Sequence, residues 1–556
     1  MQAASHDADL LHRIPLWART ILLVGCGDGA LAASYRRINP RARLLGIDPD
    51  TQAAASAATH MDQVATTDVE AEKLPFDLSG GIDCILYRGS LEYARDPAAL
   101  IRRHAEALSS DGIMLIHVPN SEHWRLADAL LRGDTEAAAR RGFSRDAMRE
   151  HLVDAGMTVC DVIRHEPDPA AAEFAETLAP GLTALGIDPV EYAQRAAPTH
   201  LTWRARKEPR QPVILSGNML RPVGGVSHVR VVHPLQAIAT DPAFRTDVTT
   251  EVSARQPDDD TPRIFVLHRP ALVGPQGMRT VQTLMAAGYL IVTEFDDHPD
   301  HFQMLRLGGD LSFRGVHALQ TSTAAMAEVL RKYNPEIAVF PNAVVSLPEV
   351  RNFAALPSIT LFFGALNRER DWGPLMPAIN AVAAAAGERL KFQVVHDQGF
   401  FDALETPHKA FTPTCDYETY LQLLGGSEVS FMPLSDTPFN RAKSDLKFIE
   451  AASCRVAPLA STVVYGDSID DGRTGLLFRD PVEFHARLSQ LVALPDLARD
   501  LGEAGRRHVA DHRMLAYQVA PRIAWYRSLW SRREVLTEAL RARVAPAVNA
   551  GALHGE

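Results

Sequence analysis

The sequence predicts an α/β protein assembled from Rossmann-like units, each a parallel sheet covered by helices. In the segment from Arg19 to Asp50, an apolar strand leads into a glycine-rich turn, a helix and a second strand that ends in a carboxylate. From residue 213 onward, apolar strand-like runs alternate with helical stretches, which is typical of parallel sheets with crossover helices. A chain of 556 residues is long enough for about three or four such units.

The composition excludes several classes of partner and site. The net charge of −11 argues against nucleic acid, because nonspecific binding to phosphate backbones needs a basic face. The sequence has no apolar run of about 18 residues, the length that indicates a membrane span. Residues 1–17 lack the pattern of a secretion signal, so we expect a cytoplasmic protein. The five cysteines show neither metal-ligand spacing nor a disulfide framework.

The first unit contains a nucleoside-cofactor motif. Gly25, Gly27 and Gly29 allow a tight turn and close approach to a ligand, and the next helix offers free backbone N–H groups. Asp48 ends the second strand, where a carboxylate accepts hydrogen bonds from ribose hydroxyls. Because Ala30 completes the pattern G-x-G-x-x-A, the motif alone also allows a dinucleotide.

Residues 1–208 resemble a class I S-adenosylmethionine-dependent methyltransferase. The resemblance implies S-adenosylmethionine as cofactor, bound by the motif glycines and Asp48 and, at the adenine, by Asp68 and Val69. The supporting segments follow in the family's order: TTDVEAEKLPF, IDCILYRGSLEYARDPAALI, DGIMLIHVPNSEHW, AGMTVCDVIRH and THLTWRARK.

The acceptor side of this unit matches the family less well. Related small-molecule methyltransferases often carry Leu-Glu-His where this chain has Leu-Glu-Tyr at residues 91–93. His117 or His123 are candidate bases, but His117 lies in an apolar strand that favours a core role, and we retain His123 as the catalytic candidate. A binding-only domain is the alternative.

A polar, proline-bearing linker at residues 207–212 ends the first unit. The strands after it form two sets separated near residues 344–357, which predicts two Rossmann-like lobes, 213–345 and 357–535, facing each other across a cleft. Residues 536–556 are expected to form a C-terminal tail. A basic amphipathic helix at its start leaves a peripheral membrane contact open.

The second half resembles the GT-B glycosyltransferases, in particular the glycosyltransferase 4-like group. The resemblance implies an acceptor-side lobe followed by a lobe for a nucleotide-sugar donor, without a bound metal ion. The segments that carry it are LRPVGGVSHVRVVHPL, PNAV at 341–344, FFGALNRERDW, FNRAKSDLKFIEAASCRVAPLAS and YGDSIDDGRTGLLF.

The donor-binding residues follow from that resemblance and from charge. A diphosphate needs cations and N–H donors, and a carboxylate suits the ribose diol. The family has two glutamates eight positions apart, but the first would fall on Ala442, so the donor sugar and the stereochemistry stay open. The predicted donor-binding residues are Gly364, Arg368, Lys443, Ser444, Lys447 and Glu450.

The segment VTEFDDHPDHF carries the catalytic candidates of the first lobe, Asp297 and His298. They are predicted to position the acceptor hydroxyl or to act as base, while a metal site and helix capping are alternatives. The predicted acceptor-side residues are Gly224, Gly225, His228 and Arg230.

The sequence therefore predicts a bifunctional glycan-modifying enzyme. A glycosyltransferase transfers sugar from a nucleotide donor to a glycan acceptor, and the N-terminal domain methylates the same glycan or its precursor. Surface polysaccharide or glycoconjugate synthesis is implied by resemblance only. The alternatives are a glycosyltransferase with a non-catalytic methyltransferase-like scaffold, and a nonenzymatic glycan-binding module. The oligomeric state stays open.

Overall fold

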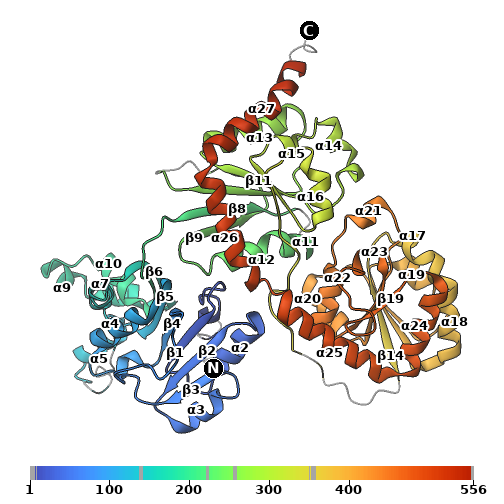
Figure 1. Ribbon diagram of the computed structural model, residues 1–556. Coiled ribbons are helices and arrows are strands. Elements are labelled where there is room, and N and C mark those ends of the chain that lie inside the picture. Colours follow the sequence, from blue (N-terminus) through green and yellow to red (C-terminus); the bar gives the residue numbers. More distant parts are fainter. Residues whose placement is uncertain are drawn as a thin grey trace. The chain divides into compact units, whose positions relative to one another are not determined.

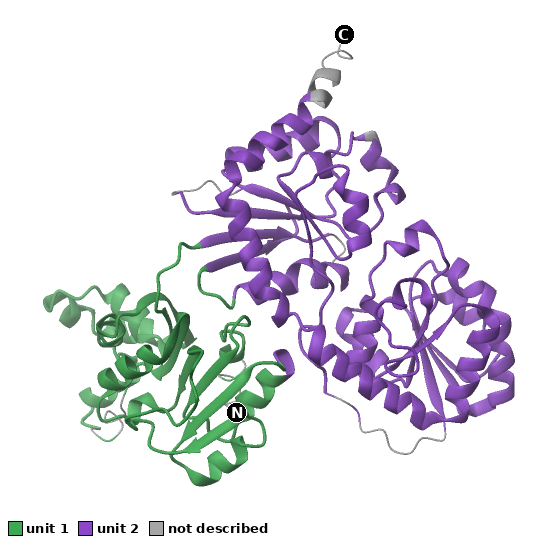
Figure 2. Ribbon diagram, viewed as in Figure 1, with its two compact units in different colours: residues 1–36, 40–212, 240–243 green, residues 37–39, 213–239, 244–556 purple. Residues whose placement is uncertain are grey.

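A computed structural model describes residues 7, 9–134, 136, 142–220, 225–254, 260–349, 351 and 358–551 (Figure 1). The chain divides into two compact units (Figure 2). Unit 1 comprises residues 1–36, 40–212 and 240–243, and unit 2 comprises residues 37–39, 213–239 and 244–556. Strands and helices alternate in both, so the α/β class is confirmed.

Within its described residues, unit 1 contains a seven-stranded sheet of order β3-β2-β1-β4-β5-β7-β6. β7 runs antiparallel to both β5 and β6, and the other pairs are parallel. The strands are β1 (Thr20–Val24), β2 (Arg43–Asp48), β3 (Gln63–Thr66), β4 (Ile82–Arg88), β5 (Leu108–Pro119), β6 (Thr158–Pro167) and β7 (Pro198–Arg206).

The helices of unit 1 begin where the sequence supplies caps. Asp50 accepts hydrogen bonds from two N–H groups of the first turn of α3, and Asp96 caps α4 just before a proline at its first position. Three helices are inserted between β6 and β7. The helices are α2 (Ala30–Ile38), α3 (Thr51–Ala57), η1 (Leu91–Tyr93), α4 (Pro97–Ala107), α5 (Trp124–Leu131), α7 (Arg145–Asp154), α8 (Ala170–Thr177), α9 (Ala179–Ala184) and α10 (Pro189–Ala196).

β7 has one apolar and one polar face, because side chains alternate along a strand. Leu201, Trp203 and Ala205 pack in the hydrophobic core of unit 1. Thr202 and Arg204 alternate with them and are also buried, so the opposite face of the sheet carries buried polar groups.

The first lobe of unit 2 contains, in its described residues, a six-stranded parallel sheet of order β13-β12-β11-β10-β8-β9. Its strands are β8 (Val213–Asn218), β9 (Phe244–Thr249), β10 (Arg263–His268), β11 (Leu290–Glu294), β12 (Ala318–Thr321) and β13 (Ile337–Val339). Its helices are α11 (Gly225–Ser227), the π-helical turn η2 (His228–Val232), α12 (His233–Ile238), α13 (Gly274–Ala286), η3 (Pro299–His301), α14 (Gln303–Leu307), α15 (Leu311–Arg314) and α16 (Ala324–Arg331).

The second lobe repeats this plan, with strand order β16-β15-β14-β17-β18-β19, all parallel, over the residues that the structure describes. Its strands are β14 (Ile359–Gly364), β15 (Leu390–Val395), β16 (Lys409–Thr412), β17 (Val429–Met432), β18 (Ala457–Ser461) and β19 (Leu476–Phe478). Its helices are α17 (Glu369–Trp372), η4 (Gly373–Leu375), α18 (Met376–Ala386), η5 (Gly387–Arg389), α19 (Gln398–Ala403), α20 (Tyr417–Gly425), α21 (Pro438–Arg441), α22 (Leu446–Ser453), α23 (Thr462–Tyr465), α24 (Pro481–Ala493) and α25 (Pro495–His512).

The last two helices return to the first lobe. α26 (Ala516–Ser531) contacts α12 and β10, and α27 (Arg533–Gly551) contacts α15 (Figure 1). The Arg543 guanidinium donates hydrogen bonds to backbone oxygens of Arg314 and Val316 at 3.2 and 2.7 Å. The segment expected as a tail is therefore, up to Gly551, a helix that contacts this lobe. Among the described helices, none combines the length and the apolar character that crossing a bilayer requires.

Candidate functional site

In unit 1 the glycine-rich loop connects β1 to α2. Gly25 has φ +77°, and a Cβ there would lie 2.8 Å from the Ser90 Cβ, so a larger residue does not fit. Gly29 has φ +85°, and a Cβ there would lie 2.7 Å from the Ala57 Cα. The Gly27 N–H donates to Asp48 Oδ2 at 2.8 Å, which joins the loop to the end of β2.

A cavity of about 390 Å³ opens beside this loop. Its lining residues are Gly25, Gly27, Asp48, Arg88, Gly89, Glu92, His117, Pro119 and His200. Two glycines and a strand-end carboxylate on the same wall suit a nucleoside whose ribose hydroxyls donate hydrogen bonds to the carboxylate.

The same cavity is also lined by groups suited to an acceptor. Glu92 is 9% exposed, burial raises the pKa of its carboxyl, and its Oε2 has no hydrogen-bond partner among the described residues. The ring of His117 stacks on that of His200, with centroids 5.1 Å apart and planes 7° apart. An unsatisfied buried carboxyl oxygen is costly, so a ligand that donates a hydrogen bond to it would be stabilised.

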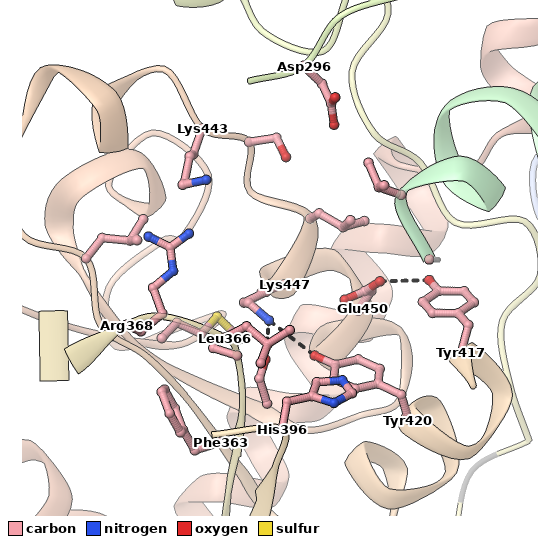
Figure 3. A pocket seen from close by; sticks show the side chains of 18 of the residues that line it. Asp296, Phe363, Leu366, Arg368, His396, Tyr417, Tyr420, Lys443, Lys447 and Glu450 are labelled. Atoms are coloured by element: carbon pink, nitrogen blue, oxygen red, sulfur yellow. Dashed lines mark hydrogen bonds between the residues drawn. The ribbon is translucent and has the colours of Figure 1, made fainter. Parts of the chain in front are cut away.

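In unit 2 a cavity of about 460 Å³ lies between the two lobes (Figure 3). The first lobe contributes Gly225, His228, Arg269, Asp296 and Asp297, among others. From the second lobe come Gly364, Arg368, His396, Tyr417, Tyr420, Lys443, Ser444, Lys447 and Glu450, together with apolar neighbours.

The cations on the second-lobe wall are partly desolvated. Burial lowers the pKa of Lys443, and the nearby Asp297 carboxylate, 3.4 Å from its Nζ, acts against this shift. Burial also lowers the pKa of Lys447, whose Nζ donates to the Gly364 carbonyl and to Tyr420 Oη. Arg368 donates to Asp371 and to Asn440, both at 3.1 Å. An anion in this cavity would stabilise the charged lysines.

Glu450 lies on the same wall, one helical turn after Lys447 on α22. Its Oε1 accepts a hydrogen bond from Tyr417 Oη at 2.7 Å, and burial raises the pKa of its carboxyl (Figure 3). The rings of His228, Tyr417, Tyr420 and His396 form a stacked row, with successive centroids 6.2, 6.4 and 6.1 Å apart.

On the first-lobe wall, Arg269, which follows β10, pairs with two consecutive carboxylates that follow the neighbouring strand β11. Its Nε lies 2.6 Å from Asp296 Oδ1 and its Nη2 lies 2.9 Å from Asp297 Oδ2. Asp297 therefore lies between the Arg269 and Lys443 cations and faces the cavity.

Comparison with known proteins finds a family match within each unit. A family model described as "Methyltransferase domain" matches residues 8–162, and one described as "Glycosyl transferase-like" matches residues 377–520. The chain joins a methyltransferase domain to a glycosyltransferase-like domain. The predicted order, a Rossmann-like methyltransferase domain followed by a GT-B pair of lobes, is confirmed.

Among curated relatives, the ubiquinone biosynthesis O-methyltransferase of Caulobacter vibrioides is 29% identical over 121 residues, which are 21% of this chain and 47% of the relative. This chain spans about half the length of the curated relatives that it matches. Two of the similar solved structures illustrate the two halves. The sucrose-phosphate synthase of Thermosynechococcus elongatus has TM-score 0.43, 14% identity and coverage of 58% of this chain and 100% of that one. The plantazolicin methyltransferase BpumL has TM-score 0.25, 18% identity and coverage of 34% and 78%.

In the methyltransferase domain, four predicted residues lie away from the cavity. Gly29 packs against α3 rather than lining the cavity. Asp68 is exposed and pairs with Arg95 at 3.1 Å, and Val69 packs against the hydrophobic core. His123 caps α5, where its Nδ1 accepts from the Arg125 N–H at 3.4 Å, and burial lowers its pKa. The adenine-binding and catalytic roles of these residues stay predictions.

In the two-lobed unit, every predicted donor residue lines the cavity: Gly364, Arg368, Lys443, Ser444, Lys447 and Glu450. Ser444 accepts a hydrogen bond at its Oγ from Asn342 Nδ2 at 2.7 Å. Gly225 and His228 also line the cavity, whereas Gly224 lies outside the described residues.

Arg230 and His298 do not line this cavity. Arg230 is 1% exposed and makes a bidentate pair with Glu294, at 2.9 and 3.0 Å. His298 precedes η3 and accepts the Asp300 N–H at its Nδ1, at 3.3 Å, so it caps this turn. Among the residues that the structure describes, no group of three or more His, Cys, Asp or Glu side chains is arranged to hold a metal ion.

The structure also brings residues to these cavities that the sequence analysis did not select. In the methyltransferase domain they are Arg88, Glu92 and His200, and between the lobes they are Arg269, His396, Tyr417 and Tyr420. The sequence carried a signal for two of them, Arg269 and His200. Arg269 directly follows a buried strand, and His200 lies on the polar positions of an alternating strand.

Proposed function

We propose that this chain is a bifunctional glycan-modifying enzyme that combines nucleotide-sugar-dependent glycosyl transfer with S-adenosylmethionine-dependent methylation. One observation carries the glycosyl-transfer half: a single cavity gathers the cations Arg368, Lys443 and Lys447 and the carboxylate Glu450. We place the work in surface polysaccharide or glycoconjugate synthesis, in the cytoplasm, as the sequence suggests.

The cations of this cavity suit the donor diphosphate. Lys443 and Lys447 supply charge, and α22 begins between them with no side-chain cap on its first N–H groups. Asp445, the residue at the cap position, pairs instead with Arg513 and Ser468. Free N–H groups at a helix start favour a phosphate oxygen.

The carboxylate of this cavity suits the nucleoside. Glu450, already oriented by Tyr417, can accept hydrogen bonds from a ribose diol with its remaining lone pairs. Tyr417, Tyr420 and His396 offer ring surfaces nearby for a base. A donor bound this way would direct its sugar toward the first-lobe wall.

That wall carries the acceptor side. Asp297 accepts hydrogen bonds or a proton from an acceptor hydroxyl, and Arg269 keeps its carboxylate oriented. In the transfer, the acceptor oxygen bonds to the anomeric carbon, the bond from that carbon to the diphosphate oxygen breaks, and the lysines stabilise the leaving diphosphate.

For the methyl-transfer half, the cradle of Gly25, Gly27 and Asp48 fits a nucleoside thioether or sulfonium. Asp48 would accept the ribose hydroxyls, and Glu92 and His117 would face the acceptor. When bound, S-adenosylmethionine supplies an electrophilic methyl group. The protein's part is to align the acceptor and exclude water.

Removing the Asp48 charge is expected to weaken binding of S-adenosylhomocysteine. In Asp48→Asn the ribose loses a charge-assisted hydrogen bond, which corresponds to about 10- to 150-fold in affinity. Isothermal calorimetry on the full chain measures it. Asp77→Asn, an exposed aspartate of the same unit, is the matched control. A folded wild-type protein that releases no heat would favour the scaffold alternative and refute methyl transfer.

Glu450→Gln is expected to weaken nucleoside diphosphate binding about 10-fold or more, because the ribose diol then meets a neutral acceptor. Calorimetry with UDP, GDP, ADP and CDP identifies the base and gives the affinity. Glu418→Gln, exposed on α20, is the control. Equal affinity in the two variants would show that Glu450 does not bind the donor.

A further inference from the structure

A line of hydrogen bonds crosses the polar face of the unit 1 sheet. His117 on β5 lies opposite Thr202 on β7 in the strand register, and its Nδ1 is 2.9 Å from Thr202 Oγ1. His165 on β6 places its Nε2 2.8 Å from the same oxygen. Its Nδ1 lies 3.3 Å from Oδ2 of Asp9, whose side chain is 61% exposed. The line therefore connects the cavity wall to a solvated carboxylate.

The chemistry of these groups determines which atoms donate. An ionised carboxylate only accepts, so the proton of His165 must lie on Nδ1, facing Asp9. A neutral imidazole then accepts at Nε2, so the Thr202 hydroxyl donates to His165. The Thr202 oxygen in turn accepts the Nδ1–H of His117. This order makes Nε2 the proton-accepting nitrogen of His117.

His117 belongs to the wall of the cavity that holds Asp48 and the glycine cradle. His200 stacks on it, His165 meets it edge-on with centroids 5.1 Å apart, and Glu92 and Arg88 line the same cavity. Thr202, His165 and His117 are 0%, 3% and 6% exposed. Solvent therefore has little access to the inner part of the line.

We propose that His117 is the proton acceptor for methyl transfer to a hydroxyl, and that Thr202, His165 and Asp9 hold its tautomer and conduct the proton outward. The inference rests on the proposed methyl transfer and adds the chemical class of the acceptor. A neutral hydroxyl is a weak nucleophile until it loses its proton. A carboxylate acceptor has no proton to lose and would not need the line of hydrogen bonds from His117 to Asp9.

In the proposed methyl transfer, the acceptor oxygen forms a bond to the methyl carbon, and the carbon–sulfur bond breaks with its electron pair going to sulfur. The hydroxyl proton moves to His117 Nε2. The Nδ1 proton of His117 then moves to Thr202, the hydroxyl proton of Thr202 moves to His165, and the Nδ1 proton of His165 moves to Asp9. Thr202, His165 and Asp9 are positioning residues and His117 is the catalytic one.

The tautomer is measured directly by NMR of ring nitrogens in the full chain labelled at histidine and saturated with S-adenosylhomocysteine. His117→Gln and His165→Gln assign the signals. We expect His117 protonated at Nδ1 in the wild type, unchanged in Thr202→Ser and in the exposed control His60→Gln, and redistributed in Thr202→Val. Asp9→Asn, at an exposed site, tests the line even if Thr202→Val fails to fold. A wild-type His117 protonated at Nε2, or one that neither variant changes, overturns the proposal.

The acceptor class is tested with labelled S-adenosylmethionine and three probes: a methyl hexopyranoside, an amino sugar and a uronic acid. We expect label on hydroxyl oxygen, and His117→Gln to lower kcat at least about 100-fold while affinity for S-adenosylhomocysteine is unchanged. Label on nitrogen or carboxylate, label on no probe, or an unimpaired variant overturns the inference. A folded wild-type protein that does not bind S-adenosylhomocysteine would instead refute the proposed function itself.

Discussion

Replacing Lys447 by methionine is expected to weaken nucleoside diphosphate binding about 100-fold without lowering the melting temperature of the unliganded protein. The Lys447 ammonium donates to a backbone carbonyl and a phenol, and burial lowers its pKa. The nearby Glu450 carboxylate acts against this shift only in part, so a bound diphosphate would stabilise the charge further. Charge-assisted hydrogen bonds of about 1.5–3 kcal/mol each account for the loss of affinity.

The nucleoside diphosphate affinity and the melting temperature together distinguish a role in binding from a role in folding. Methionine matches the length of the lysine stem and needs no desolvation of charge. The neighbouring Glu450 carboxyl, whose pKa burial raises, accepts a hydrogen bond from Tyr417 and makes no ion pair with Lys447 among the described residues, so removing this cation costs the unliganded fold little. Lys391→Met, on the exposed side of β15, is the matched control and should change neither measurement. A variant that melts earlier and still binds nucleoside diphosphates would show Lys447 to be structural.

Arg230→Met is expected to destabilise the first lobe by about 3–5 kcal/mol, because it leaves the Glu294 carboxylate buried without its cation. Both side chains are at most 1% exposed, and Arg230 also donates to the Phe340 carbonyl and to Asn342 Oδ1, each at 2.8 Å. Hydrogen exchange of β10–β12 measures the local opening free energy in the full chain. Arg331→Met, in an exposed pair with Glu328, is the control.

The sign of the pH dependence follows from Glu294. Burial raises the pKa of its carboxyl above the ordinary 4.5 although Arg230 acts against this, so losing Arg230 raises it further. The deficit of the variant should be full at pH values above the raised pKa and shrink as the pH falls through that pKa toward 4.5. The double variant Arg230→Met, Glu294→Leu should recover most of the stability. A single variant as stable as the control would contradict this account.

Much of the donor site was predictable because its residues are neighbours in sequence. Lys447 and Glu450 are three residues apart on α22, so helix geometry alone places them on adjacent surface positions. Lys443 and Ser444 immediately precede that helix. The strands were equally predictable from the sequence, since buried parallel strands form continuous apolar runs bounded by turns.

The remaining residues depend on contacts that no local pattern specifies. Tyr417 reaches Glu450 from α20, and Arg269 reaches Asp297 from a neighbouring strand end. Arg230 carries the same charge as Lys443, but its position on η2 directs it to Glu294 and away from the cavity. In unit 1, Arg95 pairs with Asp68 on the surface, and this partner could not be inferred from the strand pattern.

The return of α26 and α27 makes the first lobe a discontinuous domain into which the second lobe is inserted. The two segments that connect the lobes pair through one isolated β-bridge between Val344 and Met514. The Val344 N–H donates to the Arg513 carbonyl, and the Leu515 N–H donates to the Val344 carbonyl, both at 2.8 Å. The ends of the insert are therefore adjacent. Excising it by joining residue 344 to residue 515 through a short linker would retain both helices, whereas a fragment of residues 213–345 would lack the buried Tyr526, Leu529 and Leu540.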